Sequence, residues 1–214
     1  MQFPTLAGSL LLPLFVTFQA DKQGEKVKFY MEDILPLVTF TGGLVGIFAA
    51  VFMQFVIPLI FGTELNGAII VFWILVSSSV IAIPGIIGYA PYSNSISATY
   101  IATIMAIVAA IVNFAANFWL IPLYGIKGSA WATVLAYTAS NLVVMFIVSR
   151  RYSLEHKWTI PAVLPMLIGS IYASWTENIL TAFVLAIFGA FVIVLIYRKP
   201  FLQSVRLLTA YWKR

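Results

Sequence analysis

The sequence predicts an all-α membrane protein with about seven transmembrane helices, and three observations support this fold class. Of the 214 residues, 62% are hydrophobic and only 9% are charged, whereas a soluble domain carries about 25% charged residues. The mean hydropathy is +1.02. The apolar runs approach or exceed the length that a helix needs to cross a bilayer, and they lack the alternation of strands. Lipid is therefore the expected solvent of this chain.

Apolar run length defines the expected spans. The first run has no basic segment before it and no small-residue cleavage site after it, so it is interpreted as a span rather than a signal peptide. The second is long enough to tilt or to break near Pro58. Residues 200–214 have apolar positions at helical spacing among basic residues, which predicts an amphipathic helix on the cytoplasmic surface. The seven spans are residues 3–18, 34–61, 68–89, 97–120, 129–149, 160–175 and 179–197.

The distribution of Lys and Arg predicts the orientation. If the chain starts outside, eleven of its twelve basic residues fall on the cytoplasmic side, and only Lys127 lies outside. Eleven bases and five acids give +6 inside, one base and two acids give −1 outside, and the sum is the net charge of +5. We therefore expect a plasma or inner membrane protein with a cytoplasmic C-terminus. Membrane lipids, rather than nucleic acid, would balance the positive charge.

Several classes of chemistry are not expected. The chain has no Cys, which excludes disulfides and thiolate ligands. The single histidine, His156, lies in a charged connector and has no second histidine to help build a metal site. No charged residue or histidine falls within a predicted span, whereas proton relays and ion-coupled pumps keep such groups there. We expect no enzyme activity, no metal and no cofactor.

Uncharged polar residues within the fourth and fifth spans are the candidate cavity residues. Such groups either hydrogen-bond to neighbouring helices or line a wet cavity, and the sequence leaves both interpretations open. They lie four positions apart on one face of each span: Asn113 and Asn117 in the fourth, and Thr133, Tyr137 and Asn141 in the fifth.

A kink is expected in the third span, at the run Pro84-Gly85-Ile86-Ile87-Gly88. Proline removes a backbone donor, and glycine weakens a helix. The kink is either a static bend that allows packing or a hinge that moves in a transport cycle. Pro84, Gly85 and Gly88 are therefore the candidate hinge residues.

The turn between the fourth and fifth spans shows a family pattern. Residues 113–133 read NFAANFWLIPLYGIKGSAWAT, in which Gly125 and Gly128 permit a sharp hairpin and small residues open the next helix. A second stretch, residues 57–64, reads IPLIFGTE. Both resemble the polysaccharide-flippase branch of the multidrug/oligosaccharidyl-lipid/polysaccharide exporter superfamily. In that resemblance the chain aligns with the second half of the family only, from about the eighth span onward.

The resemblance implies that the chain is one bundle of a transporter that moves lipid-linked oligosaccharides by alternating access. The lipid-linked glycan would be the substrate, and a missing N-terminal half or second bundle would be the partner. Three alternatives remain. A multidrug antiporter half would need a coupling carboxylate in the membrane, and an enzyme of envelope glycan synthesis would need a large outer loop. A non-transporting subunit or remnant is the third.

Overall fold

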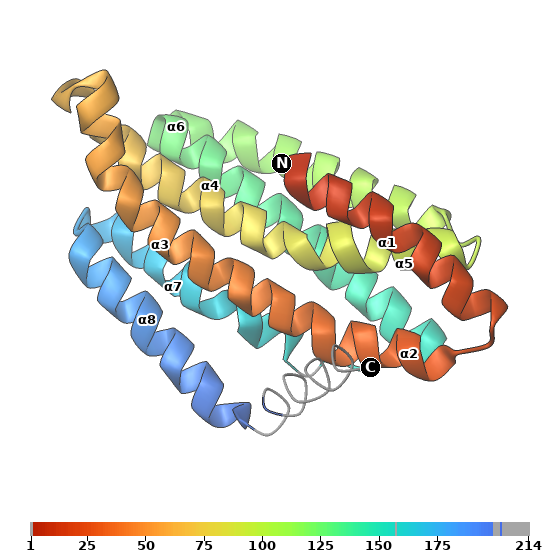
Figure 1. Ribbon diagram of the computed structural model, residues 1–214. Coiled ribbons are helices and arrows are strands. Elements are labelled where there is room, and N and C mark those ends of the chain that lie inside the picture. The colour runs from red at the N-terminus through yellow and green to blue at the C-terminus, as the bar shows by residue number, and fades with distance from the viewer. Residues whose placement is uncertain (1, 157, 199–201, 203–214) are drawn as a thin grey trace.

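The computed structural model describes residues 2–156, 158–198 and 202, and helices joined by short turns make up this part of the chain (Figure 1). No strand occurs among these residues, which confirms the predicted all-α fold class. In chain order the elements are α1 (Gln2–Ala20), α2 (Gly24–Phe29), the π-helix η1 (Tyr30–Ile34), α3 (Leu35–Phe61), the 3₁₀ turn η2 (Thr63–Leu65), α4 (Gly67–Pro84), the π-helix η3 (Gly85–Tyr89), α5 (Ala90–Ser95), α6 (Tyr100–Tyr152), α7 (Thr159–Thr176) and α8 (Ile179–Ile196).

Helix α6 consists of two antiparallel arms. Gly125 has φ 57° and ψ −132°, which lies outside the helical region. Arg151 Nη1 donates a hydrogen bond of 2.9 Å to Tyr100 Oη, although 51 residues of straight helix would span about 77 Å. The chain therefore reverses at Gly125, and Figure 1 shows the first arm (residues 100–124) alongside the second arm (residues 126–152).

The connectors alternate between two ends of the bundle. The α3–α4 turn, the Gly125 turn and the α7–α8 turn lie at one end, which we call the Glu64 end (Figure 1). An ion pair of 2.6 Å between Lys127 Nζ and Glu177 Oε1 joins two of these turns. The opposite end, which we call the Arg150 end, carries the connectors that follow α1, α5 and α6.

The helices are long and apolar enough for a membrane. Five helical stretches in the described residues meet the length and composition needed to cross a bilayer, and one of them is the two-armed α6. Large apolar side chains face outward, among them Leu59, Phe114 and Leu180, which are at least 70% exposed. The chain is a multi-pass membrane protein, while the number of seven crossings stays a prediction.

Three segments differ from the predicted spans. Residues 90–95 are helical, although the region between residues 89 and 97 was expected to be a loop. Pro91 stands in the first turn of α5, where a missing N–H is tolerated. Helix α3 passes through Pro58 unbroken and ends at Gly62, which has φ 80°. The connector before α3 is largely helical, and the predicted amphipathic tail lies outside the described residues apart from Leu202.

Helix α4 is the central element. It packs against α3, α6 and α7, and its Trp73 side chain is fully buried in the core that α4 shares with α3, α7 and α8. Ser170 Oγ of α7 donates a hydrogen bond of 3.2 Å to the Trp73 carbonyl. This central position places the kink region of α4 in the interior of the bundle, where its backbone groups need partners from other helices.

Candidate functional site

A small cavity lies where α4 continues into η3 and both arms of α6 pass. Its volume is about 110 Å³, which is enough for a few water molecules or a small substituent. We call it the α4–α6 cavity. Its lining comes from three segments: Ala82, Gly85 and Ile86 of α4 and η3, Met105, Ala106 and Ala109 of the first arm, and Tyr137, Ser140 and Asn141 of the second arm.

Asn141 is the polar centre of this cavity. Its side chain is 7% exposed, and its Nδ2 donates to the carbonyls of Ile81 at 2.8 Å and Tyr137 at 3.0 Å. Two carbonyl acceptors fix which end of the amide is the nitrogen. The oxygen Oδ1 is consequently directed toward Gly85 and has no hydrogen-bond partner in the described structure. A buried acceptor without a partner is suited to receive a donor from a ligand or from water.

The local backbone explains why Asn141 is needed. Pro84 has no N–H for the carbonyl of Val80, and the Gly85 N–H donates to Ala82 rather than to Ile81. The Ile81 carbonyl would therefore lack an α-helical donor, and Asn141 supplies one from the facing helix. From Gly85 the chain continues as a π-helix, a rare form that often occurs at functional sites.

Gly85 allows the close approach of the two elements. A Cβ at this position would lie 2.8 Å from Asn141 Oδ1 and 3.0 Å from Met105 Sδ. The predicted hinge residue Gly85 and the predicted cavity residue Asn141 therefore contact the same small space. Pro84, the residue before it, is buried at the end of α4.

The other candidate residues lie elsewhere. Asn117 Nδ2 donates to Asn113, to its carbonyl and to its Oδ1, both at 2.9 Å. Thr133 Oγ1 donates to the Ser129 carbonyl at 3.2 Å. These three side chains do not line the α4–α6 cavity. The structure thus brings Tyr137 and Asn141 together and leaves Asn113, Asn117 and Thr133 with local hydrogen bonds.

The remaining candidate glycines serve helix packing and the turn. Gly88 lies against the Leu35 side chain, which a Cβ would overlap. Gly125 forms the reversal of α6, and a Cβ at Gly128 would overlap the Leu120 carbonyl. Close packing of both arms at the turn therefore depends on Gly128.

Sequence reasoning missed six of the nine residues that line the cavity, among them Met105 and Ser140. Met105 lies eight positions before Asn113, on the same helical face, so extending the Asn113 face toward the start of the span would have found it. Ser140 precedes Asn141 directly, and its Oγ donates to the Tyr137 carbonyl at 3.1 Å. It was not among the candidates because it does not belong to the series Thr133, Tyr137 and Asn141, whose members are four positions apart.

The Arg150 end of η3 is fixed by a polar contact that the sequence did not predict. Tyr89 Oη and His156 Nδ1 are 3.1 Å apart, and the two rings meet edge to face. Tyr30 Oη also donates to the Ile87 carbonyl at 3.0 Å. Burial lowers the pKa of His156 to about 4, so the imidazole is neutral near pH 7 and Nδ1 can accept the tyrosine proton. His156 is therefore an anchor of η3 rather than a free loop residue.

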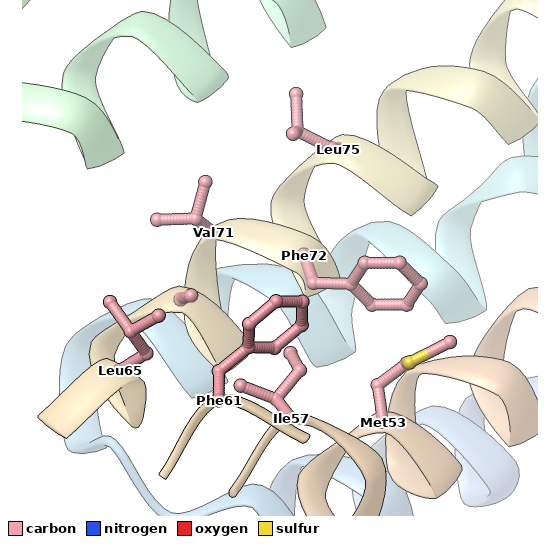
Figure 2. Close-up of a pocket in the computed structure, with 8 residues that line it drawn as sticks. Met53, Ile57, Phe61, Leu65, Val71, Phe72 and Leu75 are labelled. Carbon is pink, nitrogen blue, oxygen red and sulfur yellow. The ribbon is translucent and has the colours of Figure 1, made fainter. Parts of the chain in front are cut away.

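A separate groove of about 380 Å³ runs along the Glu64 end of α3 and α4. Figure 2 shows that carbon side chains and the sulfur of Met53 line it, with no nitrogen or oxygen. Phe61 and Leu65, which lie at one end of the groove, are more than 40% exposed. This surface suits lipid chains and offers nothing to hold a polar ligand.

Comparison with known proteins gives no further guide. No protein-family model, no curated protein and no solved structure matches the chain.

Proposed function

We propose that this bundle is part of a membrane transporter that translocates lipid-linked oligosaccharide by alternating access. The observation that carries the proposal is the place of the α4–α6 cavity. The two arms of α6 form one wall of it, outside the stretch 113–133 that resembles the flippase family, and the end of α4 with the start of the π-helix η3 forms the other. A small cavity that contains a buried, unpaired amide oxygen lies there beside a proline and a π-helical segment inside a membrane bundle, and such a place allows helices to move against each other.

The polar groups of the cavity favour a small uncharged substituent, such as a sugar hydroxyl, over a coupling ion. Its polar side chains are an amide, a phenol and a hydroxyl from Asn141, Tyr137 and Ser140. Such groups donate to and accept from sugar hydroxyls. No carboxylate lines the cavity, although a cation-coupled antiporter would use one in the membrane. On the same grounds we propose a transporter rather than an enzyme.

Alternating access requires a second bundle that moves against this one. We propose that the chain works with such a partner in the plasma or inner membrane. The distribution of basic residues supports an orientation in which the Arg150 end faces the cytoplasm, together with the C-terminus. The substrate glycan would then leave at the Glu64 end.

Deletion of the gene in its native host tests the proposal. We expect surface polysaccharide to be lost and lipid-linked precursor to accumulate inside, and we expect a plasmid copy to restore export. The variant Asn141→Leu should restore less than the native copy, while Asn117→Leu should restore export fully. Normal surface polysaccharide together with increased drug sensitivity would instead support a multidrug antiporter and contradict the proposal.

A further inference from the structure

A second pocket, of mixed polarity, opens at the Glu64 end between α3, the start of α4 and the α7–α8 turn. Its volume is about 360 Å³, within the range of pockets that hold small ligands. Its polar groups are Gln54, Asn66 and Glu177, and its apolar walls include Pro58, Ile70 and Ile179. We call it the outer pocket. It shares no lining residue with the apolar groove of Figure 2, although both border the α3–α4 turn.

Gln54 has no structural reason to be polar. It is the one polar side chain in residues 42–61 of α3, seven positions, or about 10 Å, from the helix end at Phe61. Its amide makes no hydrogen bond within the described structure. Pro58, one turn later, has no N–H to offer the Gln54 carbonyl. The amide of Gln54 therefore lacks a protein partner beside the pocket, and its carbonyl lacks the usual α-helical donor four residues later.

Asn66 adds a second amide on the facing wall. It precedes α4 as the N-cap, but its side chain makes no capping hydrogen bond. An asparagine at this position normally accepts one from the first turn of the helix. Its side chain is exposed and has no partner among the described residues, so it can donate to and accept from a ligand.

Glu177 contributes a carboxylate that is already neutralised. Lys127 Nζ lies 2.6 Å from its Oε1, and this hydrogen bond and charge hold the pKa of Glu177 below its usual range. The ion pair with Lys127 uses only Oε1 of this carboxylate. The pocket therefore presents acceptors and donors with a charge balance of zero, which suits a neutral ligand better than a phosphate.

From these groups we infer that the outer pocket binds a sugar ring of the translocated glycan as it reaches the Glu64 end. Amides and a carboxylate can hydrogen-bond to vicinal hydroxyls, and the wall of Pro58, Ile70 and Ile179 can cover the apolar face of the ring. The identity of the ligand as a glycan rests on the proposed function. The pocket itself rests on Gln54 and Asn66, whose side chains have no other partner.

Binding of simple glycosides tests the inference. The chain is placed in lipid nanodiscs, and a panel of methyl glycosides of hexoses and N-acetylhexosamines is titrated by saturation-transfer-difference NMR. We expect saturable binding of at least one glycoside. Gln54→Leu and Asn66→Ala should each weaken it by roughly tenfold, the effect of losing about one well-made hydrogen bond.

Matched variants separate the pocket from the rest of the surface. Met53→Leu changes the neighbouring residue, which lines the apolar groove, and Asn94→Ala removes an exposed amide at the Arg150 end. Both should bind glycosides as the native chain does. No saturable binding of any glycoside, or equal binding by Gln54→Leu and the native chain, would overturn the inference.

The two proposals fail separately. Glycoside binding that depends on Gln54, in a host whose surface polysaccharide survives gene deletion, would leave the outer pocket as a sugar site and refute the transport proposal. Loss of polysaccharide on deletion, with no glycoside binding, would refute the outer pocket alone.

Discussion

Helices α4 and α8 have the same length and are both strongly apolar, but they differ in how much of their surface is buried against other helices. α8 buries one narrow stripe, Ala182, Ala186, Ala190 and Ile193, and leaves most of its large side chains outward. α4 is buried on most of its faces, carries Ser77 and Ser78, and ends at Pro84, where the chain continues as a π-helix. Both helices suit lipid by composition, yet only α4 contains features that lipid cannot stabilise.

This difference in burial indicates that functional residues are to be sought on the central helix α4 and its neighbours rather than on the lipid-facing helix α8. Where a helix faces lipid, a backbone carbonyl that has lost its helical donor stays unpaired, because lipid tails offer no donor, and the helix is destabilised. A helix in the centre of a bundle can keep such a carbonyl if a neighbour supplies the donor, as Asn141 does for Ile81. The proline-containing end of α4 and the polar residue of α6 therefore form one structural unit.

Removal of the Asn141 amide should have the largest effect on stability. Asn141→Leu leaves the Ile81 carbonyl unpaired in the interior and should lower the free energy of unfolding by about 1–2 kcal/mol. Asn117→Leu removes an amide that bonds only within its own helix, so its effect should stay below about 0.5 kcal/mol. Unfolding in mixed micelles, followed by circular dichroism, measures both. Equal effects would mean that Asn141 is not a special partner of α4.

A glycine-to-alanine pair sharpens the comparison of the two helices. Gly85→Ala places Cβ 2.8 Å from Asn141 Oδ1 and should destabilise by about 1 kcal/mol after the gain in helix propensity. At Gly189 of α8 the nearest atom is 3.6 Å away, so Gly189→Ala should stabilise by up to about 1 kcal/mol. The same micelle measurement gives both signs. A stabilising Gly85→Ala would contradict the tight contact at Gly85.

Acidification should loosen the anchor of η3 at Tyr89. The pKa of His156 is lowered to about 4 in the folded chain, while an unfolded histidine has a pKa near 6.5. Between these values the unfolded state binds the extra proton, so stability falls as pH falls through about 6.5 to 4. Thermal unfolding across this range should show a steeper loss for the native chain than for His156→Asn. If stability changed with pH equally in the native chain and in His156→Asn, the pKa of His156 would not be lowered in the folded chain.

The smallest effect is expected at the start of α8. Lys127 and Glu177 form an ion pair at the surface, and exposed pairs contribute little. Lys127→Met should leave the midpoint of unfolding unchanged within the error of the measurement. A clear decrease in the midpoint would mean that this pair holds the Gly125 turn in place.

The sequence predicted the fold class and most helix positions because apolar run length is a direct consequence of bilayer thickness. It also predicted the turn at Gly125, since glycine acts locally. The kink expected at residues 84–88 stays a prediction, because the backbone there is helical and continues as a π-helix. The sequence could not predict that residues 90–95 are helical. After Pro84 the chain continues as a π-helix from Gly85 to Tyr89 and then as α5, and this local change of helix type leaves no signal in the apolar pattern.

The candidate site was predicted only in part, for a physical reason. Spacing shows which residues share a helical face, but the choice between Asn141 and Asn117 depends on which carbonyl lies opposite. Only the packed structure places Ile81 against Asn141. Gln54 had a signal in the sequence, as the one polar residue of residues 42–61, but its significance comes from the pocket that it faces.

Cysteine accessibility tests most directly whether the α4–α6 cavity belongs to a substrate path. The chain has no native Cys, so Ala109→Cys in the cavity and Ala110→Cys on the exposed face beside it form a matched pair. In proteoliposomes, we predict that a charged methanethiosulfonate reagent labels Ala109→Cys and that lipid-linked oligosaccharide slows this labelling, while Ala110→Cys stays unlabelled. Equal labelling of both positions, or labelling of Ala109→Cys that the oligosaccharide leaves unchanged, would contradict the proposed role of the cavity.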